Sequence, residues 1–287
     1  AKNLGLPKDL TSLKRSAAQY SSGVNTIFKE IAKENNTSKS KYLLKLRNKN
    51  IKLGVLSSSG KDSIYAMHVM DRLNYDIACL ISIQSENKDS FMFHTPNIKL
   101  ATLHAKALDL PIIEQKTKGK KELELTDLKE AIIKAKEKYN IQGLVSGAIF
   151  SNYQRSRIEA IADELNLKVF SPLWHTDQLQ YMKTLVKQDF EIIITKVAAE
   201  GLDESWLGRK IDEKAIQDLE NINKKTQLNI AGEGGEFESL VLDAPMFKKK
   251  LIIEKSNKIP EDKNTAALEI KDISLKKKVL KEKKKVE

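Results

Sequence analysis

The sequence predicts an α/β protein with a doubly wound, five-stranded parallel sheet, followed by a second, smaller α+β domain. Two observations predict this architecture. Apolar runs of strand length alternate with segments of helical spacing between residues 51 and 173, and the alternation stops near residue 175. Strands that alternate with helices form parallel sheets with right-handed crossovers. A chain of 287 residues with 40% hydrophobic residues is long enough for both domains.

The first strand and helix set the pattern. The apolar run IKLGVL occupies residues 51–56, and Ile64, Met67, Met70 and Leu73 then follow at intervals of three, as on one helix face. We expect the sheet order 3-2-1-4-5, in which ligands bind beside the first and fourth strands where the order reverses. The other expected strands of this domain are 76–83, 111–115, 143–147 and 168–173, and the other expected helices are 98–108, 123–139 and 154–165.

The second domain and the two ends have a different pattern. After residue 175 we expect helices over 179–187 and 213–224 and strands over 191–199, 248–259 and 266–275. The predicted organisation is therefore a basic N-terminal extension over 1–50 with one helix near 11–34, a nucleotide-binding domain over 51–175, a substrate-binding domain over 176–275, and a Lys-rich tail over 276–287.

The positive charge of the chain lies at its two ends. The formal net charge is +11, but residues 51–275 hold 32 basic and 34 acidic residues. Residues 1–50 carry eleven Lys or Arg against three acids, and residues 276–287 carry seven Lys against two Glu. Charge runs at termini are usually solvated. We therefore interpret both ends as solvated tails rather than RNA-binding arms, and expect no nucleic acid to be required.

The cysteine content and the length of the apolar runs bear on the compartment. Cys79 is the single cysteine and lies in an apolar run, so we expect a buried packing residue and no internal disulfide. No stretch approaches the roughly 18 apolar residues that span a bilayer, and the first residues contain no uninterrupted apolar segment. These features predict a cytoplasmic protein that does not associate with membranes.

The stretch LSSSGKDS, residues 56–63, connects the first strand to the first helix. It is not a Walker A loop, because Lys61 is followed by Asp62 instead of Ser or Thr, and it lacks the second glycine of the dinucleotide fingerprint. Backbone N–H groups at a helix N-terminus, serine hydroxyls and a lysine charge suit a phosphate. The residues alone leave two interpretations open, a phosphate-binding loop and an ordinary turn with Asp62 or Ser63 as helix N-cap.

Several stretches resemble a known family. Residues 58–63 resemble the S-G-G-x-D-S pattern of the PP-loop, or N-type ATP pyrophosphatase, superfamily, with Ser59 at the position of the first glycine. SFMFHTPN (90–97), GAIFSNYQRSRIE (147–159), KVAAEGLDESWLGR (196–209) and GEGGEFESLVLDAPMF (232–247) resemble one branch of it, the diphthine–ammonia ligase family. The resemblance spans about 51–275 and excludes both basic ends.

The resemblance implies a fold and an activity. The fold would be that of the adenine nucleotide α-hydrolases, and residues 51–175 would be a PP-loop ATP-binding domain. The activity would be the ATP-dependent amidation of diphthine, a modified histidine of translation elongation factor 2, with ammonium as nitrogen source. An acyl-adenylate would form, and AMP and pyrophosphate would be released. ATP and Mg²⁺ are the implied cofactors.

The resemblance also implies the residues of the nucleotide site. Lys61 and Asp62 would be catalytic, and Asp62 is the nearest acid for Mg²⁺, which usually binds phosphate oxygens plus one or two carboxylates. The residues implied to contact ATP are Ser58, Ser59, Gly60, Lys61, Asp62, Ser63, His94, Gly147 and Ala148.

An acidic turn is implied to bind the acceptor. The turn is GEGGE, which the residues alone also allow to be a charged Gly-rich hairpin turn. Acidic and aromatic side chains would attract trimethylammonium or ammonium, and one Glu would act as general base, with Glu236 as the catalytic candidate. The implied substrate-binding residues are Asn152, Tyr153, Arg157, Glu233, Glu236 and Glu238, and Arg155, Trp174, Trp206 and Phe237 are further candidates.

Three other functions are alternatives to this activity. A PP-loop tRNA-thiolating enzyme shares the loop but moves sulfur through cysteines, and the only cysteine here is in an expected buried strand. An amidotransferase would need a glutaminase cysteine, which leaves free ammonia as the nitrogen source. A module that binds ATP without cleaving it would release neither AMP nor pyrophosphate.

Overall fold

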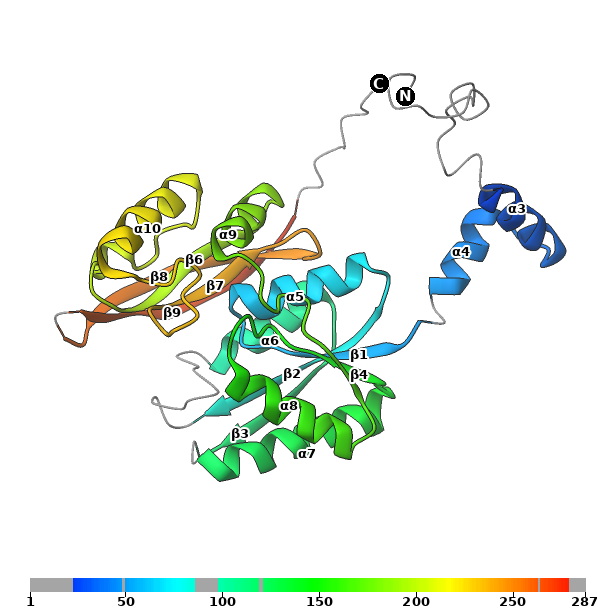
Figure 1. Ribbon diagram of the computed structural model, residues 1–287, viewed down its shortest axis with the longest axis horizontal. Coiled ribbons are helices and arrows are strands. Elements are labelled where there is room, and N and C mark those ends of the chain that lie inside the picture. The colour runs from blue at the N-terminus through cyan, green and yellow to red at the C-terminus, as the bar shows by residue number, and fades with distance from the viewer. Residues whose placement is uncertain (1–22, 48–49, 86–97, 119–120, 263, 279–287) are drawn as a thin grey trace, which may run out of the picture. The chain divides into compact units, whose positions relative to one another are not determined.

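The computed structural model describes residues 23–47, 50–85, 98–118, 121–262 and 264–278 (Figure 1). The chain divides into two compact units, the first ending at Asn50 and the second beginning at Ile51.

The first unit contains two helices in its described part. Helix α3 (Val24–Glu34) ends where the sequence predicted, and residues 11–22 of the expected helix lie outside the described residues. A second helix, α4 (Lys39–Arg47), was not predicted. The chain breaks between the two at Asn36, which adopts a left-handed conformation with φ of 49°, and Ser38 accepts a hydrogen bond from the Lys41 N–H at the start of α4.

The second unit begins with the predicted parallel sheet. Its strand order is β3-β2-β1-β4-β5 and every neighbouring pair is parallel, so the predicted order and fold class are confirmed. The strands are β1 (Lys52–Leu56), β2 (Asp76–Ser85), β3 (Ile112–Thr117), β4 (Gly143–Val145) and β5 (Lys168–Phe170). The last of these is shorter than the expected strand, which continued to residue 173.

Helices cover both faces of this sheet, as the alternating pattern requires (Figure 1). Apolar residues of α7 and α8 form one core with one face of the strands, and apolar residues of α5 and α6 belong to a second core on the other face. The helices are α5 (Lys61–Arg72), α6 (Ile98–Leu108), α7 (Lys121–Tyr139) and α8 (Asn152–Glu164). Cys79 is buried in the core beneath α7, as predicted, and burial raises the pKa of its thiol to about 12.

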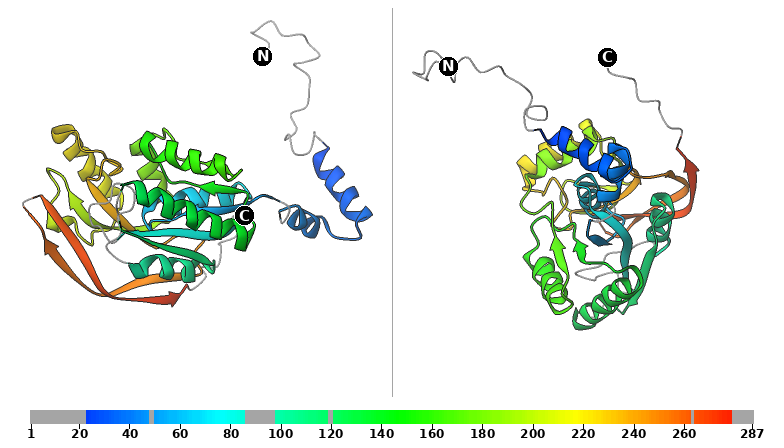
Figure 2. Two further views of the ribbon diagram at one scale, coloured as in Figure 1. Left: turned by 90° about the horizontal axis from the view of Figure 1, so that it is seen from below. Right: turned by 90° about the vertical axis from the view of Figure 1, so that its right-hand side faces the viewer.

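A separate antiparallel sheet follows, with the strand order β7-β6-β9-β8. Its two long strands, β8 and β9, form an extended ribbon, shown in orange to red in Figure 2. The strands are β6 (Glu191–Ala198), β7 (Phe237–Asp243), β8 (Lys249–Pro260) and β9 (Thr265–Lys277), and the helical elements are α9 (Gln178–Lys187), the 3₁₀ turn η2 (Glu204–Trp206) and α10 (Glu213–Thr226). This sheet and its helices are the α+β arrangement that the sequence predicted.

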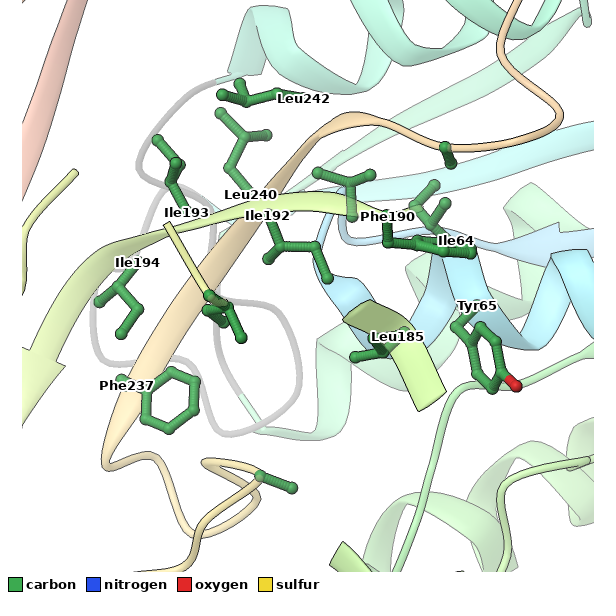
Figure 3. Close-up of a cluster of buried hydrophobic side chains, with 14 of the residues drawn as sticks. Ile64, Tyr65, Leu185, Phe190, Ile192, Ile193, Ile194, Phe237, Leu240 and Leu242 are labelled. Carbon is green, nitrogen blue, oxygen red and sulfur yellow. The ribbon is translucent and has the colours of Figure 1, made fainter. Parts of the chain in front are cut away.

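One continuous core joins the two sheets. Figure 3 shows Ile64 and Tyr65 of α5 near Ile192 of β6 and Leu240 of β7. Helix α5 therefore packs against the first sheet and also against the second. Both sheets of the unit therefore hold α5, the helix that follows the candidate phosphate-binding stretch.

The C-terminal boundary differs from the expected one. Strand β9 continues to Lys277, because Lys276 and Lys277 pair with Lys250 and Lys249 of β8. Lys278 then forms an ion pair with Asp243 at 2.7 Å. The first residues of the expected tail are thus part of the folded unit, and residues 279–287 lie outside the described ones. No helix in the described part of the chain is long and apolar enough to cross a membrane.

Candidate functional site

We call the loop between β1 and α5, residues 57–60, the phosphate loop. The Ser63 hydroxyl donates to the Gly60 carbonyl at 3.1 Å and accepts from the Ser58 N–H at 3.3 Å, which closes the turn. Helix α5 begins at Lys61, and its N-cap is Gly60, which has no side chain to offer. The expectation that Asp62 or Ser63 caps the helix is wrong, because both lie within its first turn. An N-terminus without a side-chain cap is a suitable anion site.

Two serine hydroxyls of the loop are suited to bind a ligand. Ser59 has a φ of 68°, the left-handed region that favours glycine. The Ser57 and Ser59 hydroxyls are buried and have no hydrogen-bond partner among the described residues. Buried hydroxyl groups are almost always satisfied by protein, water or ligand. The loop therefore fits the phosphates of a nucleotide.

Strand β7 of the second sheet holds the loop from the other side. The Ser239 hydroxyl accepts from the Lys61 N–H at 3.2 Å, and the Val241 N–H donates to the Ser59 carbonyl at 3.3 Å. The Val241 carbonyl accepts from Nε2 of His104, a fully buried side chain of α6, at 2.6 Å. One side-chain contact and one backbone contact thus attach the loop and the start of α5 to the second sheet.

A charged cluster lies at the start of α5. Lys61 is only 3% exposed, and its Nζ contacts both carboxylate oxygens of Asp62, at 3.0 and 2.9 Å. The Tyr181 hydroxyl donates to Oδ1 of the same carboxylate at 2.8 Å. The Nζ also lies 5.5 Å from the centre of the Phe237 ring, within cation–π range. One lysine, one carboxylate and two aromatic rings from three elements thus meet beside the phosphate loop.

Glu233 connects the acidic turn to the loop after β4. Its Oε1 accepts from the N–H groups of Ile149 and Phe150, at 3.2 and 3.1 Å. Burial raises the pKa of Glu233, and the charge of Asp62 raises it further, while the two N–H groups and Lys61 oppose the shift. Glu233 is therefore electrostatically linked to the charged cluster.

Gly147 and Ala148, expected to face the nucleotide, lie at the end of β4. A Cβ atom on Gly147 would come within 2.7 Å of the Asp62 and Ser63 backbone, so only glycine allows this close approach. Ala148 is buried and its N–H donates to the Ser146 hydroxyl. Gly147 therefore allows the chain after β4 to pack directly against the first turn of α5.

Glu236 and Glu238 lie differently from Glu233. Glu236 accepts from the Asn229 N–H with Oε1 and from the Gly234 N–H with Oε2, at 3.1 and 2.8 Å, so it closes its own turn. Glu238 is half-buried in β7. Successive side chains of a strand alternate, so Glu238 faces away from the side on which Ser239 meets the loop.

The candidates of α8 stack on aromatic rings. The Arg157 guanidinium lies 3.4 Å from the centre of the Tyr153 ring, and that of Arg155 lies 4.6 Å from the Trp174 ring and pairs with Glu159. Asn152 is exposed at the first position of this helix. Asn152, Tyr153, Arg155 and Arg157 are thus gathered on one helix.

Trp206, a further candidate, does not join the site. Trp206 is buried beneath the Arg209 guanidinium, at 4.2 Å, and offers no open face to a substrate cation. His94 lies outside the described residues, as does the whole stretch 90–97. Within the described part of the chain, no group of three or more His, Cys, Asp or Glu side chains is arranged to hold a metal ion.

Sequence reasoning missed Tyr181, Ser239 and His104 as members of this site. Tyr181 and His104 occupy apolar positions of amphipathic helices. An aromatic residue at such a position is expected to be a packing residue of the core. Ser239 lies within the GEGGEFESLVLDAPMF stretch that the family resemblance marked, and this is the only signal that could have drawn attention to it.

The doubly wound sheet and the phosphate loop at its switch point define a nucleotide-binding α/β protein of the PP-loop class. Family models described as the diphthamide synthase N-terminal and C-terminal domains match residues 51–169 and 177–276. The chain belongs to the diphthine–ammonia ligase family, which confirms the resemblance drawn from the motifs.

Individual relatives support this membership. Diphthine–ammonia ligase of Bos taurus is 34% identical over 225 residues, which cover 72% of this chain and 84% of the relative. The Homo sapiens enzyme is 32% identical with the same coverage, and that of Schizosaccharomyces pombe is 34% identical over 69% of this chain and 35% of its own length.

The chain is also similar to a solved structure. It is described as a predicted subunit of tRNA methyltransferase from Methanocaldococcus jannaschii and is 19% identical, covering 80% of this chain and 100% of its own. Its TM-score is 0.34, which is too low to bear on fold or function.

Proposed function

We propose that this protein is an ATP-dependent ligase that amidates the carboxylate of diphthine on translation elongation factor 2, with ammonium as the nitrogen donor. AMP and pyrophosphate are the other products. A translation factor as substrate makes the reaction cytoplasmic. The proposal rests on the membership of both domains in the diphthine–ammonia ligase family and on the meeting of Lys61, Asp62 and Glu233 beside the phosphate loop.

In the first step, a diphthine carboxylate oxygen attacks the α-phosphorus of ATP. The bond between the α- and β-phosphates breaks, pyrophosphate leaves, and an acyl-adenylate remains. The phosphate loop suits this step because its N–H groups and serine hydroxyls are already fixed before charge develops on the leaving group. Lys61 would leave Asp62 for the phosphates and neutralise part of that charge.

In the second step, ammonia attacks the acyl carbon, the C–N bond forms, and the bond to AMP breaks. Ammonium must lose a proton first. Glu233 suits this task, because burial raises the pKa of its carboxyl group toward the range in which a carboxylate accepts protons efficiently. Glu236 would contribute by shaping the turn that presents Glu233, since both of its oxygens bind backbone N–H groups of that turn.

Mg²⁺ would support the first step by neutralising phosphate charge. Asp62 is suited to hold it, since its carboxylate lies in the first turn of α5 and is partly exposed. A single protein carboxylate together with phosphate oxygens is a usual arrangement for this ion.

Sulfur transfer has no comparable support. Cys79 is fully buried, and the raised pKa of its thiol opposes formation of a thiolate. The family to which both domains belong is also named for amidation and not for thiolation.

The decisive experiment is incubation of the protein with ATP, ammonium and diphthine-bearing elongation factor 2. We expect mass spectrometry to find the carboxyl group of the modified histidine converted to a carboxamide, with one AMP and one pyrophosphate formed per amide. Asp62→Asn should abolish AMP formation and leave the circular dichroism spectrum unchanged. Release of ADP and phosphate, or an unmodified histidine after full ATP consumption, would refute the proposal.

A further inference from the structure

Tyr181 has a hydroxyl group that packing alone does not explain. The residue lies in α9, is 1% exposed, and belongs to the core together with its neighbours Met182 and Leu185. Phenylalanine would fill the same space. A buried phenol keeps its hydroxyl at low cost only where a partner is present, and the partner here is Oδ1 of Asp62 at 2.8 Å.

The two donors of Asp62 are not equivalent. Lys61 Nζ spans both carboxylate oxygens, whereas the Tyr181 hydroxyl contacts only Oδ1. A lysine ammonium on a flexible stem can move to the phosphates of a bound nucleotide. A phenol on a packed ring cannot move in this way, so its hydrogen bond would remain and would leave Oδ2 available.

The ring that carries this hydroxyl is rigidly held. Its centre lies 5.5 Å from the ring of Tyr65 in α5, and α9 begins at an N-cap, Asp177, whose side chain accepts from the Gln180 N–H at 2.8 Å.

We propose that Tyr181 is a positioning residue for nucleotide binding: its hydroxyl fixes Oδ1 of Asp62, so that Oδ2 would be left to hold the Mg²⁺ of a bound nucleotide once Lys61 has moved to the phosphates. The second domain would thereby set the geometry of the phosphate loop through one hydrogen bond. This inference rests on the proposed function only in taking ATP with Mg²⁺ as the ligand.

The test is the substitution Tyr181→Phe, with Tyr65→Phe as matched control. Tyr65 is also a buried tyrosine of this core, and its hydroxyl contacts Gln188 at 3.4 Å and not the loop. ATP affinity is titrated with excess Mg²⁺ and again with EDTA. A hydrogen bond to a charged group contributes about 1.5–3 kcal/mol, so we expect Tyr181→Phe to lose roughly tenfold or more in affinity with Mg²⁺ and less than about twofold without it. Tyr65→Phe should change neither value.

A double-mutant cycle then identifies the route of the effect. In an Asp62→Ala background the phenol has no carboxylate to fix, so adding Tyr181→Phe should alter the affinity for Mg²⁺–ATP by less than about twofold. Equal losses with and without Mg²⁺, no loss at all, or a full additional loss in the Asp62→Ala background would each overturn the inference. Because these are binding measurements, they stand apart from amidation: correct binding behaviour without amide formation would reject the proposed function and leave Tyr181 in its role.

Discussion

Ser59 occupies a backbone conformation that costs a non-glycine residue about 1–2 kcal/mol, since its φ is 68°. We expect Ser59→Gly to be more stable than Ser59→Ala by about 1 kcal/mol, because both lose the hydroxyl and only glycine relieves the strain. Thermal unfolding measures the difference. ATP titration of both variants measures the contribution of the Ser59 hydroxyl to ATP affinity. We expect both variants to lose affinity by the same factor relative to the wild type. An alanine variant as stable as the glycine variant would contradict the strain argument.

Glu233 and Glu236 provide a matched pair of substitutions. Glu233→Gln keeps the single oxygen that accepts from Ile149 and Phe150, so we expect a normal melting temperature with loss of amide formation. Glu236→Gln replaces one of two accepting oxygens by an NH₂ group and leaves a backbone N–H unpaired, at a cost of about 1 kcal/mol in this half-buried turn. Melting curves and product mass compare the two. A Glu236→Gln variant with unchanged stability and no amidation would show that Glu236, and not Glu233, is the catalytic residue.

From the sequence, Lys61 and Asp62 could be named as neighbouring candidates, but Tyr181 and Ser239 could not. Lys61 and Asp62 adjoin each other in the chain, so their meeting follows from local structure. Tyr181 and Ser239 reach the same place from 119 and 178 residues away. Their arrival depends on how the second sheet packs against α5, which no local pattern determines.

Strand β7 and helix α6 are joined by one buried hydrogen bond that makes the fold sensitive to acid. His104 donates to the Val241 carbonyl, and burial lowers its pKa to about 4 from the ordinary 6.5. Between these values the unfolded chain binds the proton and the folded chain does not. Stability must therefore fall as the pH decreases from 6.5 to 4, by roughly 3 kcal/mol from this residue alone.

Urea unfolding at several pH values measures this effect. We expect His104→Gln, which cannot titrate, to be less stable than the wild type at neutral pH and to lose less stability on acidification. A variant whose stability falls as steeply as that of the wild type between pH 6.5 and 4 would show that His104 is not the group responsible.

Helices and strands were predicted correctly where the hydrophobic pattern continues over many residues. The prediction failed at a break between two helices and at the end of a strand. The five parallel strands and their helices follow from clear alternation. Helix α4 was missed because its charged sequence, KSKYLLKLR, follows a polar stretch that gave no reason to expect a second helix. The end of β9 was missed because Lys276 and Lys277 were assigned to the Lys-rich tail. Their pairing with β8 requires only backbone groups.

At the scale of the whole molecule, the two sheets share one core. Ile64 and Tyr65 of α5 lie in the same cluster as Ile192 and Leu240 of the second sheet (Figure 3). Neither sheet could unfold without exposing apolar surface of the other, at about 25 cal/mol per Å². Residues 51–278 should therefore behave as one cooperative unit, even though family models match its two halves separately.

This predicts the outcome of truncation. We expect residues 51–278 to unfold in a single calorimetric transition within about 2 °C of the corresponding transition of the full chain, because the shared core and the β8–β9 ladder are intact. Shortening the chain further to residue 275 removes two ladder residues and the ion pair of Lys278 with Asp243, which is partly exposed and contributes at most about 1 kcal/mol. The melting temperature should then fall by a few degrees while the single transition persists. Two separate transitions in residues 51–278, or an isolated fragment 51–175 that melts cooperatively at the temperature of the parent, would show that the sheets are independent and that the core between them contributes little.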